Sequence, residues 1–446
     1  MATLGIEVVD AALVAVREGA CVASSPGVAL LAPEGLKVGE PAAAAQRLQP
    51  VLAADRFWSD LAVDSHAGGA GVTLSHADLA HAHLADVWRR VATAGDEAVF
   101  ALPGSMRLHQ AGLLLGIARR IGLPVAGVVD SAVAACAGLP ARAAVLHLDV
   151  HLYQSVLTIL EGATTLRRRR VEIAPRAGLK AMYGAWAQLV SEAMVRRTRF
   201  DPLHQAATEQ QLYERLPGWL GVLAAADSID VSIDTPAGSF AATVRREQFT
   251  LAAEAWYAQV AELVQAGYRS ERPTTLVLGA RAARLPALAA RLAALPGIEV
   301  LELPEAAAAA AAAERVAEIG PGDPPQLVTA LARRHAAAGG AQRREAGQPA
   351  THVVLEGRAH AIDERPLVVG LGEGAGRRIA LGGSGEGVSR AHCTLLREGG
   401  RTIVRDHSRY GTFLNGERVD GESEVGAGDR LRVGRPGFVL ELVAVD

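Results

Sequence analysis

Apolar residues recur at two spacings along the first 335 residues of the chain. Short continuous apolar runs are typical of buried strands, and apolar residues that recur every three or four positions are typical of helices. Ser75 and Asp78 have the spacing of a capping box, so a helix should begin there. The strands expected on this basis span 4–9, 12–16, 98–103, 144–149 and 155–160. The expected helices span 76–91, 105–121, 131–137, 186–195, 251–264 and 286–294, with an alanine-rich helix from Pro304 onward.

The pattern changes close to residue 335. Residues 336–349 are mostly small or charged and show no apolar period, so they are expected to form a flexible linker. Strand-like and helix-like segments alternate before this linker, which predicts an α/β domain over 1–335. Short apolar runs separated by Gly, Asp and Asn follow it, which predicts an all-β domain over 350–446.

Composition narrows the class of protein. Half of the 446 residues are hydrophobic but only 4% are aromatic, so alanine supplies much of the apolar character. The chain has no uncharged apolar run of eighteen residues and no basic-then-apolar leader, so we expect neither a membrane span nor a signal peptide. Three widely separated cysteines favour free thiols in the cytoplasm. A net charge of −3 gives no general attraction to nucleic acid.

Several isolated features receive ordinary structural interpretations. The run Arg167–Arg170 has no neighbouring aromatic residues that could stack bases, so we expect an exposed hairpin end. His76, His81 and His83 lack the i, i+4 spacing of a helical metal site. Cys136 lies among small residues and is expected to pack in a core. We therefore predict no metal site and no catalytic residue.

Two short motifs late in the chain carry the most specific signal. The first is Ser389-Arg390-Ala391-His392, and the second runs from Ser408 to Gly416. Together they resemble the forkhead-associated (FHA) domain, a β-sandwich whose loops bind phosphothreonine. The resemblance implies that Ser389 and Arg390 bind the phosphate and that Arg409 and Tyr410 contact the flanking peptide. It implies structural roles for Gly370, His392, Gly411, Thr412 and Asn415.

One position departs from the FHA pattern. Family members usually have an arginine after the glycine that corresponds to Gly370, whereas this chain has Leu371, which cannot donate a charge-assisted hydrogen bond. We expect Arg377 or Arg378 to reach the phosphate instead, because guanidinium groups neutralise a doubly charged phosphate well. The alternative is an FHA fold that serves as a phosphate-independent contact or dimer surface.

The order of segments over 1–335 resembles the two-lobed, ribonuclease H-like fold shared by actin, sugar kinases and DnaK-type heat-shock chaperone ATPases. The match is closest over 99–139. In that family, glycine-rich turns let backbone amides approach the phosphates of ATP, because glycine has no Cβ in the way. The resemblance assigns the corresponding nucleotide site to Glu7, Asp10, Asp149 and Gly279.

The turns at this site depart from the family pattern. Val9 occupies a glycine position of the first turn, and His151, Leu152 and Tyr153 replace the glycines of the second. Side chains there would occupy the space of the phosphates. We therefore expect a vestigial site, a pseudoenzyme without ATP hydrolysis, and no cofactor, with binding of ATP and Mg²⁺ as the less favoured alternative.

These expectations combine into one hypothesis, a cytoplasmic bacterial adaptor in signalling. An actin-like, DnaK-like scaffold domain would be joined to an FHA domain that recruits a phosphothreonine-containing protein, the substrate of a Ser/Thr kinase. Self-association is a further expectation, and neither nucleic acid binding nor direct membrane insertion is expected. A nucleotide-binding chaperone and a self-assembling actin-like scaffold are the alternatives.

Overall fold

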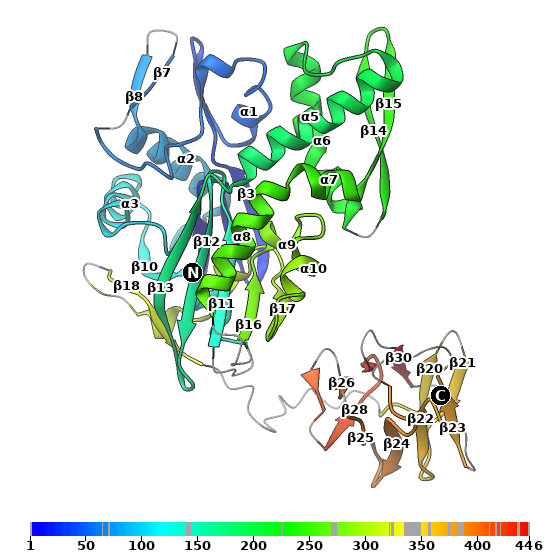
Figure 1. The fold of residues 1–446 in the computed structure, drawn as a ribbon. Helices are drawn as coiled ribbons and strands as arrows, with labels where there is room; N and C mark the ends of the chain where they lie inside the picture. Colours follow the sequence, from blue (N-terminus) through cyan, green and yellow to red (C-terminus); the bar gives the residue numbers. More distant parts are fainter. Residues whose placement is uncertain are drawn as a thin grey trace. The chain divides into compact units, whose positions relative to one another are not determined.

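The computed structural model describes most of the chain. The residues described are 2–64, 66–69, 72–139, 144–224, 226–268, 274–320, 322, 325–333, 349–355, 358–372, 376–381, 388–409, 411–414, 417–419, 421–434 and 438–444. The chain divides into two compact units, residues 1–338 and 339–446 (Figure 1). Each unit has its own hydrophobic core. The division falls within the segment that the sequence predicts to be a linker, but Pro349, at its end, already forms a β-bridge with Gly426 of the second unit.

Two six-stranded sheets form the centre of the N-terminal unit. The first has the order β18-β10-β9-β1-β2-β3 and the second β17-β16-β11-β12-β13-β19. The strands of the first sheet are β1 (Thr3–Val8), β2 (Ala12–Arg17), β3 (Ala20–Pro26), β9 (Glu97–Leu102), β10 (Val125–Asp130) and β18 (Leu327–Val328). Those of the second are β11 (Ala144–Val150), β12 (Gln154–Glu161), β13 (Thr165–Pro175), β16 (Thr274–Leu278), β17 (Ile298–Glu302) and β19 (Ala330–Ala332).

The two sheets repeat one arrangement. In each, three consecutive strands form an antiparallel meander, β1-β2-β3 in the first and β11-β12-β13 in the second. The first strand of each meander also pairs in parallel with a later strand, β1 with β9 and β11 with β16. A further parallel strand follows on that side, β10 or β17. The N-terminal unit is therefore a mixed α/β structure, as the sequence predicts.

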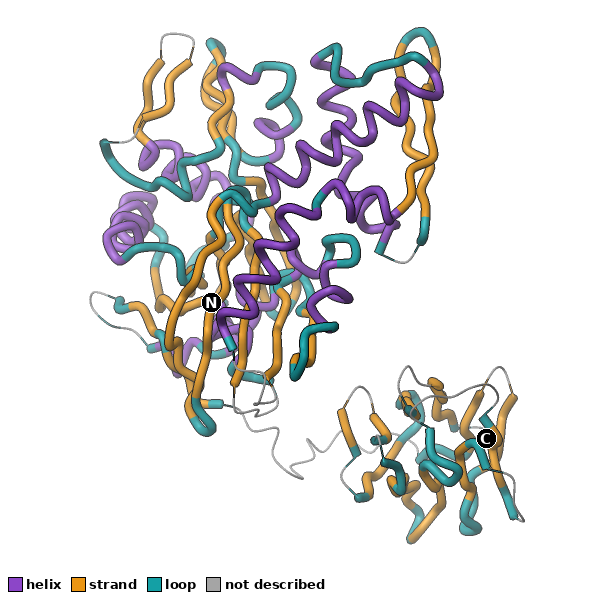
Figure 2. The backbone as a smooth tube through the Cα atoms, in the orientation of Figure 1, coloured by secondary structure: helices purple, strands orange, loops and turns teal. Residues whose placement is uncertain are grey.

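Helices cover both sheets and fill the space between them (Figures 1 and 2). The first sheet packs one face on α2 (His76–Val91) and α3 (Leu108–Ile121). The second packs one face on α8 (Glu254–Gly267), whereas α5 (Leu179–Thr198) and α6 (Ala206–Leu223) pack on the hairpin of β14 (Ser228–Thr235) and β15 (Gly238–Arg245) (Figure 1). The core between the sheets includes α4 (Ser131–Cys136) and α11 (Ala307–Glu314). The backbones of β1 and α11 touch at Gly5, because a Cβ added there would lie 1.8 Å from the carbonyl oxygen of Ala309.

Smaller elements complete this unit. They are β4 (Ala29–Ala32), β5 (Gly35–Val38), α1 (Glu40–Ala43), the 3₁₀ turn η1 (Pro50–Leu52), β6 (Ala53–Ala54), β7 (His66–Gly69), β8 (Val72–Ser75), β14 (Ser228–Thr235), β15 (Gly238–Arg245), α7 (Arg246–Ala252), α9 (Ala280–Ala283), α10 (Leu288–Ala293) and α12 (Val316–Ile319). Among the described residues, none of the helices combines the length and apolar character needed to span a bilayer.

Three expectations from the sequence need correction in this unit. The helix expected over 251–264 is divided into α7 and α8, which meet at the buried Ala253. The helix expected from 105 begins at Leu108, because the side chain of Gln110 accepts a hydrogen bond from the backbone amide of Arg107 and caps the helix there. The helix expected from Pro304 begins at Ala307, because Ala306 adopts a left-handed conformation with φ of 64°.

The run of four arginines also lies differently from its expected position. It forms part of β13 rather than the end of a hairpin. Neighbouring residues of a strand face opposite sides, and Arg168 turns inward, where its Nη1 donates to Oδ2 of the buried Asp130 at 2.7 Å. Arg167 and Arg169 are exposed. The run is therefore mostly a solvent-facing strand with one inward guanidinium.

The C-terminal unit contains strands and loops and, among its described residues, no helix (Figure 2). Its sheets have the orders β21-β20-β30-β29-β26-β27 and β23-β22-β24-β25-β28 and share one core. The strands are β20 (His352–Leu355), β21 (Arg358–Ala361), β22 (Leu367–Gly370), β23 (Arg378–Ala380), β24 (Cys393–Glu398), β25 (Arg401–Asp406), β26 (Thr412–Leu414), β27 (Glu417–Arg418), β28 (Glu422–Val425), β29 (Arg430–Val433) and β30 (Phe438–Val443). The predicted all-β domain is confirmed.

Candidate functional site

Two loops of the C-terminal unit meet directly after β22. The backbone amides of Leu371 and Gly372 donate to the carbonyl oxygens of Ser389 and Arg390 at 3.2 Å and 3.0 Å. Gly370 permits this approach, because a Cβ there would lie 2.5 Å from the oxygen of Arg390. The backbone of the Ser389-Arg390 loop is therefore fixed against the end of a core strand.

His392 joins this loop to a second one. Its side chain is fully buried, its Nδ1 accepts a hydrogen bond from the amide of Ser389 at 3.1 Å, and its Nε2 lies 3.0 Å from the carbonyl oxygen of Gly411. Because Nδ1 accepts, the ring proton must be on Nε2, which donates to Gly411. The resemblance implies a structural role for His392, and these contacts are structural ones.

The second loop, residues 407–411, is shaped by its own side chains. Oδ1 of Asp406 accepts from the hydroxyl of Thr412 at 2.7 Å and from the amide of Ser408 at 3.0 Å. The hydroxyl of Ser408 accepts from the amide of Gly411 at 2.7 Å. Burial alone would raise the pKa of Asp406, but these hydrogen bonds outweigh it and lower the pKa. The carboxylate therefore stays charged and holds the loop.

Ser389 lies where the two loops touch. Its hydroxyl oxygen accepts from the backbone amide of Arg409 at 3.3 Å, which leaves the hydroxyl proton available to a ligand. The side chains of Arg390 and Arg409 are exposed, and neither forms an ion pair within the described part of the chain. Ser389, Arg390 and Arg409 thus form a small cationic surface with one hydroxyl donor.

Arg378 lies beside the same loops. Its Nη1 donates to the carbonyl oxygens of Arg390 at 2.9 Å and Gly372 at 3.1 Å. Its remaining guanidinium N–H groups bond no other described residue. Arg378 therefore both supports the loop that follows β22 and keeps donors for an anion.

Arg377, its neighbour, does not belong to this site. It bonds Oδ1 of Asp363 at 2.5 Å and the carbonyl oxygen of Arg365 at 3.2 Å, and it also donates to the carbonyl oxygen of Ala361. These partners lie away from the loops, as expected for adjacent residues at the start of a strand. The hypothesis that either arginine could reach a phosphate is thus reduced to Arg378.

The remaining positions of the FHA-like motif differ in how far they can be described. Leu371 is partly buried and packs against the core of the C-terminal unit, so its side chain is not directed to a ligand. Thr412 is buried and bonded to Asp406. Tyr410 and Asn415 lie outside the described residues.

The four positions that the resemblance assigns to a nucleotide site lie close together in the N-terminal unit, and the side chain of Arg281, which is not among them, lies between Glu7 and Asp149. Nη2 of Arg281 donates to Oε1 of Glu7 at 2.6 Å and also to Asp149, whose Oδ1 lies 3.2 Å from Nε of Arg281. Burial alone would lower the pKa of Arg281, but Asp149 and Glu7 outweigh it and raise it. Gly279 is close as well, since a Cβ there would lie 3.0 Å from Asp149.

His151 lies beside this cluster. Its Nε2 lies 3.6 Å from Oδ2 of Asp149, and although burial alone would lower its pKa, the nearby carboxylates of Asp149 and Asp10 outweigh burial and raise it. Asp10 accepts the amide of Leu152 at 3.0 Å and so joins the two hairpin turns. The sequence did not indicate Arg281 as a partner because it lies 274 residues from Glu7, although it stands two residues after Gly279, which the resemblance assigns to the site.

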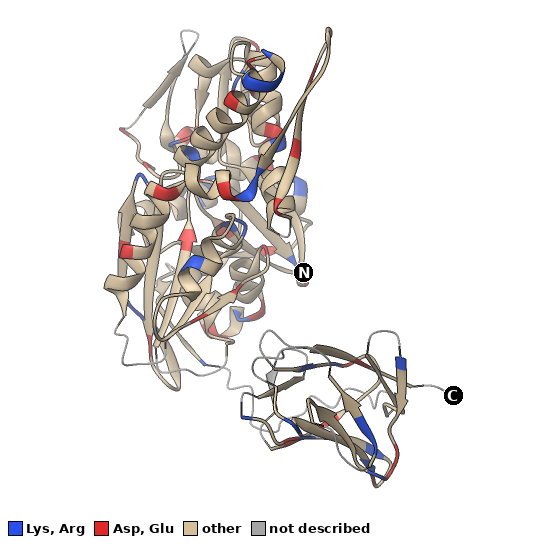
Figure 3. Cartoon of the chain, turned by 45° about the vertical axis from the view of Figure 1, so that its right-hand side comes forward, with Lys and Arg blue, Asp and Glu red and all other residues tan. Residues whose placement is uncertain are grey.

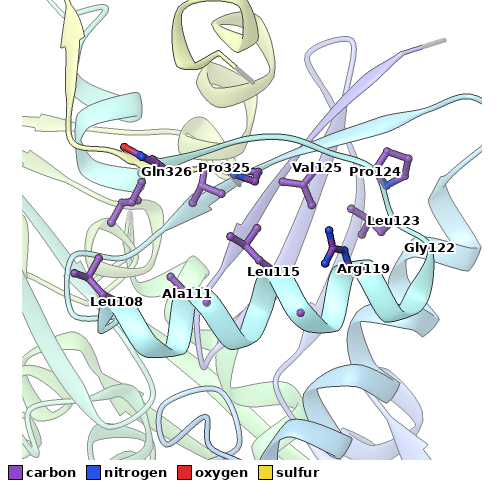
Figure 4. Close-up of a pocket in the computed structure, with 14 residues that line it drawn as sticks. Leu108, Ala111, Leu115, Arg119, Gly122, Leu123, Pro124, Val125, Pro325 and Gln326 are labelled. Atoms are coloured by element: carbon purple, nitrogen blue, oxygen red, sulfur yellow. The ribbon is translucent and has the colours of Figure 1, made fainter. Parts of the chain in front are cut away.

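Two cavities of the N-terminal unit differ in the polarity of the side chains that line them. A 390 Å³ cavity adjoins the cluster and is lined by Glu7, Asp149 and Arg281 among others. A 950 Å³ cavity beside α3 is mainly apolar, and Arg119 is the one charged side chain among its lining residues (Figure 4). Within the described ranges, no group of three His, Cys, Asp or Glu side chains is arranged to hold a metal ion.

Comparison with known proteins identifies one part of the chain. No curated protein matches it. Residues 369–434, which contain β22, the two joined loops, His392 and the arginines around Ser389, match the family model of the FHA domain. The chain therefore carries an FHA domain in its C-terminal unit.

Proposed function

We propose that this protein is a phosphorylation-dependent adaptor whose FHA domain recruits a phosphothreonine-containing protein. The observation that carries the proposal is the junction of the two loops, where the hydroxyl of Ser389 and the guanidinium of Arg378 flank the same backbone segment. A phosphate there would accept hydrogen bonds from the hydroxyl and from guanidinium N–H groups, which is the arrangement that best neutralises a doubly charged phosphate.

Arg378 takes the place of the arginine that Leu371 replaces. Its Nη1 is used by two carbonyl oxygens, and this fixes the guanidinium plane before any ligand binds. A fixed guanidinium loses little conformational entropy on binding, so it favours affinity. Arg390 and Arg409, which are exposed, would add charge around the phosphate and along the flanking peptide.

The N-terminal unit would act as a scaffold with an actin-like fold and a nucleotide site that no longer works. The repeated strand order of its two sheets supports the fold, and Arg281 between Glu7 and Asp149 supports the loss of nucleotide binding. In an active enzyme of this kind a divalent cation would require such carboxylates, and here a guanidinium already neutralises them. A cytoplasmic location, a Ser/Thr kinase that modifies the partner, and self-association belong to the same proposal.

Binding of matched peptides tests this function. The full chain should bind a phosphothreonine peptide library and not the unphosphorylated one, as measured by fluorescence anisotropy. Ser389→Ala, Arg390→Ala and Arg378→Ala should each weaken binding about tenfold or more, because each removes a hydrogen bond to a charged group. Arg377→Ala is the matched control, since Arg377 bonds Asp363 instead, and it should leave affinity within about twofold.

A phosphate-independent FHA surface is the second candidate, and the uncharged Leu371 favours it. In that case both libraries would bind equally, or neither would, and the three variants would not differ from Arg377→Ala. This result would refute phosphate recognition.

A further inference from the structure

A second basic region lies in the N-terminal unit, far along the sequence from the FHA loops. A cavity of 820 Å³ is lined by the ends of five segments, and four of its lining residues are cations: Arg56, Arg107, Arg176 and Lys180. We call it the basic cleft. Asp60 is the one acidic residue that lines it. Figure 3 shows that elsewhere basic and acidic residues are interspersed along the ribbon.

The cations of the basic cleft are not all neutralised within the chain. Lys180 pairs with Asp55, and Arg56 lies 3.8 Å from Asp60. Arg107 and Arg176 are exposed and form no ion pair within the described part of the chain. At least two guanidinium groups can therefore bind an external anion.

Two of these cations, Arg107 and Lys180, lie where the electrostatic energy is unfavourable unless an anion is bound. Arg107 occupies the N-cap position of α3, and Lys180 lies in the first turn of α5. Helix N-termini carry partial positive charge and favour acidic residues, yet neither helix has one in its first turn. An acidic ligand in the cleft would therefore meet cations and helix N-termini that repel one another in the free protein.

Arg176 is also held in an unfavourable backbone conformation. Its φ is 66°, a region that glycine adopts easily and arginine does not. Residues held in such conformations are concentrated at functional sites. No hydrogen bond within the described residues uses the Arg176 side chain, so the structure retains an arginine where a glycine would fit better.

The lining of the cleft favours one class of ligand. Tyr153 and His109 are the aromatic side chains that line it, and the guanidinium of Arg56 already covers the ring of Tyr153 at 3.9 Å while the Tyr153 hydroxyl bonds Asp55. The ring of Tyr153 is therefore not free to stack on a nucleobase. Exposed aliphatic surface is present instead, with Ile173 41% exposed beside Pro175 and Leu152. Aliphatic walls between cations suit a peptide in which acidic and aliphatic residues alternate.

We propose that the basic cleft binds an acidic, unphosphorylated peptide segment of a partner protein. This site is independent of the FHA loops and would give the adaptor a second point of attachment. Because the contacts are charged and partly exposed, binding should weaken strongly between low and high salt.

The test uses the full chain and a fluorescein-labelled peptide of alternating Glu and Leu, with a Gln-Leu peptide of equal length as the neutral comparison. Fluorescence anisotropy should show binding of the acidic peptide at least tenfold tighter than of the neutral one. Arg107→Ala and Arg176→Gly should each weaken it about tenfold, the effect of losing one charge-assisted hydrogen bond. Arg176→Gly also removes the conformational strain of an arginine with positive φ, so thermal unfolding should show a melting temperature no lower than that of the unchanged protein.

Arg199→Gly is the matched control. Arg199 is also an exposed arginine with positive φ, at 62°, but it lies at the other end of α5, roughly 30 Å from Lys180 by helix rise. The control should bind the acidic peptide as the unchanged protein does.

Competition separates this site from others. An excess of phosphothreonine peptide should not displace the acidic peptide from the unchanged protein, and neither should ATP or pyrophosphate at equal concentration.

Four results would overturn the proposal. Equal losses in Arg176→Gly and Arg199→Gly would mean that only general charge matters. Equal binding of the neutral peptide would remove the role of the acidic residues. Displacement by phosphothreonine peptide would assign binding to the FHA loops, and displacement by ATP or pyrophosphate would identify a pocket for small anions.

Discussion

At the scale of single residues, buried polar side chains show what the sequence could not. His83 is one of three histidines that the sequence clusters on one helix, and its position there gives no sign of a partner. In the structure it is fully buried, Trp58 donates its indole N–H to Nδ1 at 3.0 Å, and Nε2 lies 2.8 Å from the hydroxyl of Ser25. Trp58 and Ser25 come from loops and strands 25 and 58 residues away, so no local pattern predicts these contacts.

His83 should make the stability of the N-terminal unit depend on pH. Burial lowers its pKa from 6.5 to about 4. Between these values the unfolded chain binds a proton that the folded chain does not, so the free energy of unfolding falls as pH decreases from 6.5 to 4. The loss attributable to His83 is about 3 kcal/mol, at about 1.4 kcal/mol for each pH unit.

Urea unfolding followed by tryptophan fluorescence measures this effect, because all five tryptophans lie in the N-terminal unit. His83→Gln should lower stability at neutral pH but flatten the decline between pH 6.5 and 4. Val87→Ala, a fully buried change on the same helix, should lower stability by a similar amount at every pH. An unchanged slope in His83→Gln would contradict the assignment.

At the scale of elements, strands with one clear apolar pattern could be predicted and others could not. The sequence predicts β1, β2, β11 and β12 to within one or two residues, because they are buried on both faces and read as continuous apolar runs. β13 carries four arginines and alternates irregularly between exposed and buried positions. It is a strand because it pairs with β12 and β19, and pairing with distant segments leaves no local signal.

Two glycines allow the effect of close packing on stability to be compared with the effect of helix propensity. Gly5 lies in β1 where the backbone of α11 crosses, and Gly5→Ala would place a Cβ 1.8 Å from the oxygen of Ala309. Either strand or helix must move, so we expect a loss of about 3 kcal/mol in the free energy of unfolding. Gly112 lies within α3 with nothing within 4 Å of an added Cβ. Gly112→Ala should therefore add roughly 1 kcal/mol through helix propensity.

Urea unfolding of both variants checks the pair. The two changes add the same methyl group, so a loss of stability in Gly5→Ala alone is assigned to the contact of α11 with β1. If Gly5→Ala were as stable as Gly112→Ala, α11 would not pack as closely on β1 as described.

At the scale of the whole molecule, the sequence predicted the FHA loops better than it predicted what occupies the N-terminal cluster. Ser389, His392 and Ser408 lie in short motifs whose partners are within about twenty residues of one another, so the motif specifies the geometry. The N-terminal cluster joins Glu7, Asp149 and Arg281 from three distant segments. The sequence shows which residues stand in these segments, but not that the guanidinium of Arg281 pairs with both carboxylates.

The last prediction concerns that guanidinium. Arg281 belongs to α9, which follows β16 of the second sheet, and it pairs with Glu7 on β1 of the first sheet and Asp149 on β11 of the second. Its two ion pairs therefore join the two sheets of the N-terminal unit. Removing one partner of a buried ion pair leaves the other charges unpaired, so Arg281→Ala should cost about 3 kcal/mol.

Arg284→Ala is the matched control, because Arg284 lies three residues further on and pairs with Glu305 in solvent, where both side chains are about half exposed. Arg284→Ala should lower the free energy of unfolding by less than about 1 kcal/mol.

Since Arg281 already neutralises the carboxylates of Glu7 and Asp149, Mg²⁺ with ATP should leave the melting temperature of the unchanged protein where it is. A rise in melting temperature with Mg²⁺ and ATP would show that a nucleotide is accommodated despite Arg281, and it would make the N-terminal unit a nucleotide-binding domain rather than a scaffold.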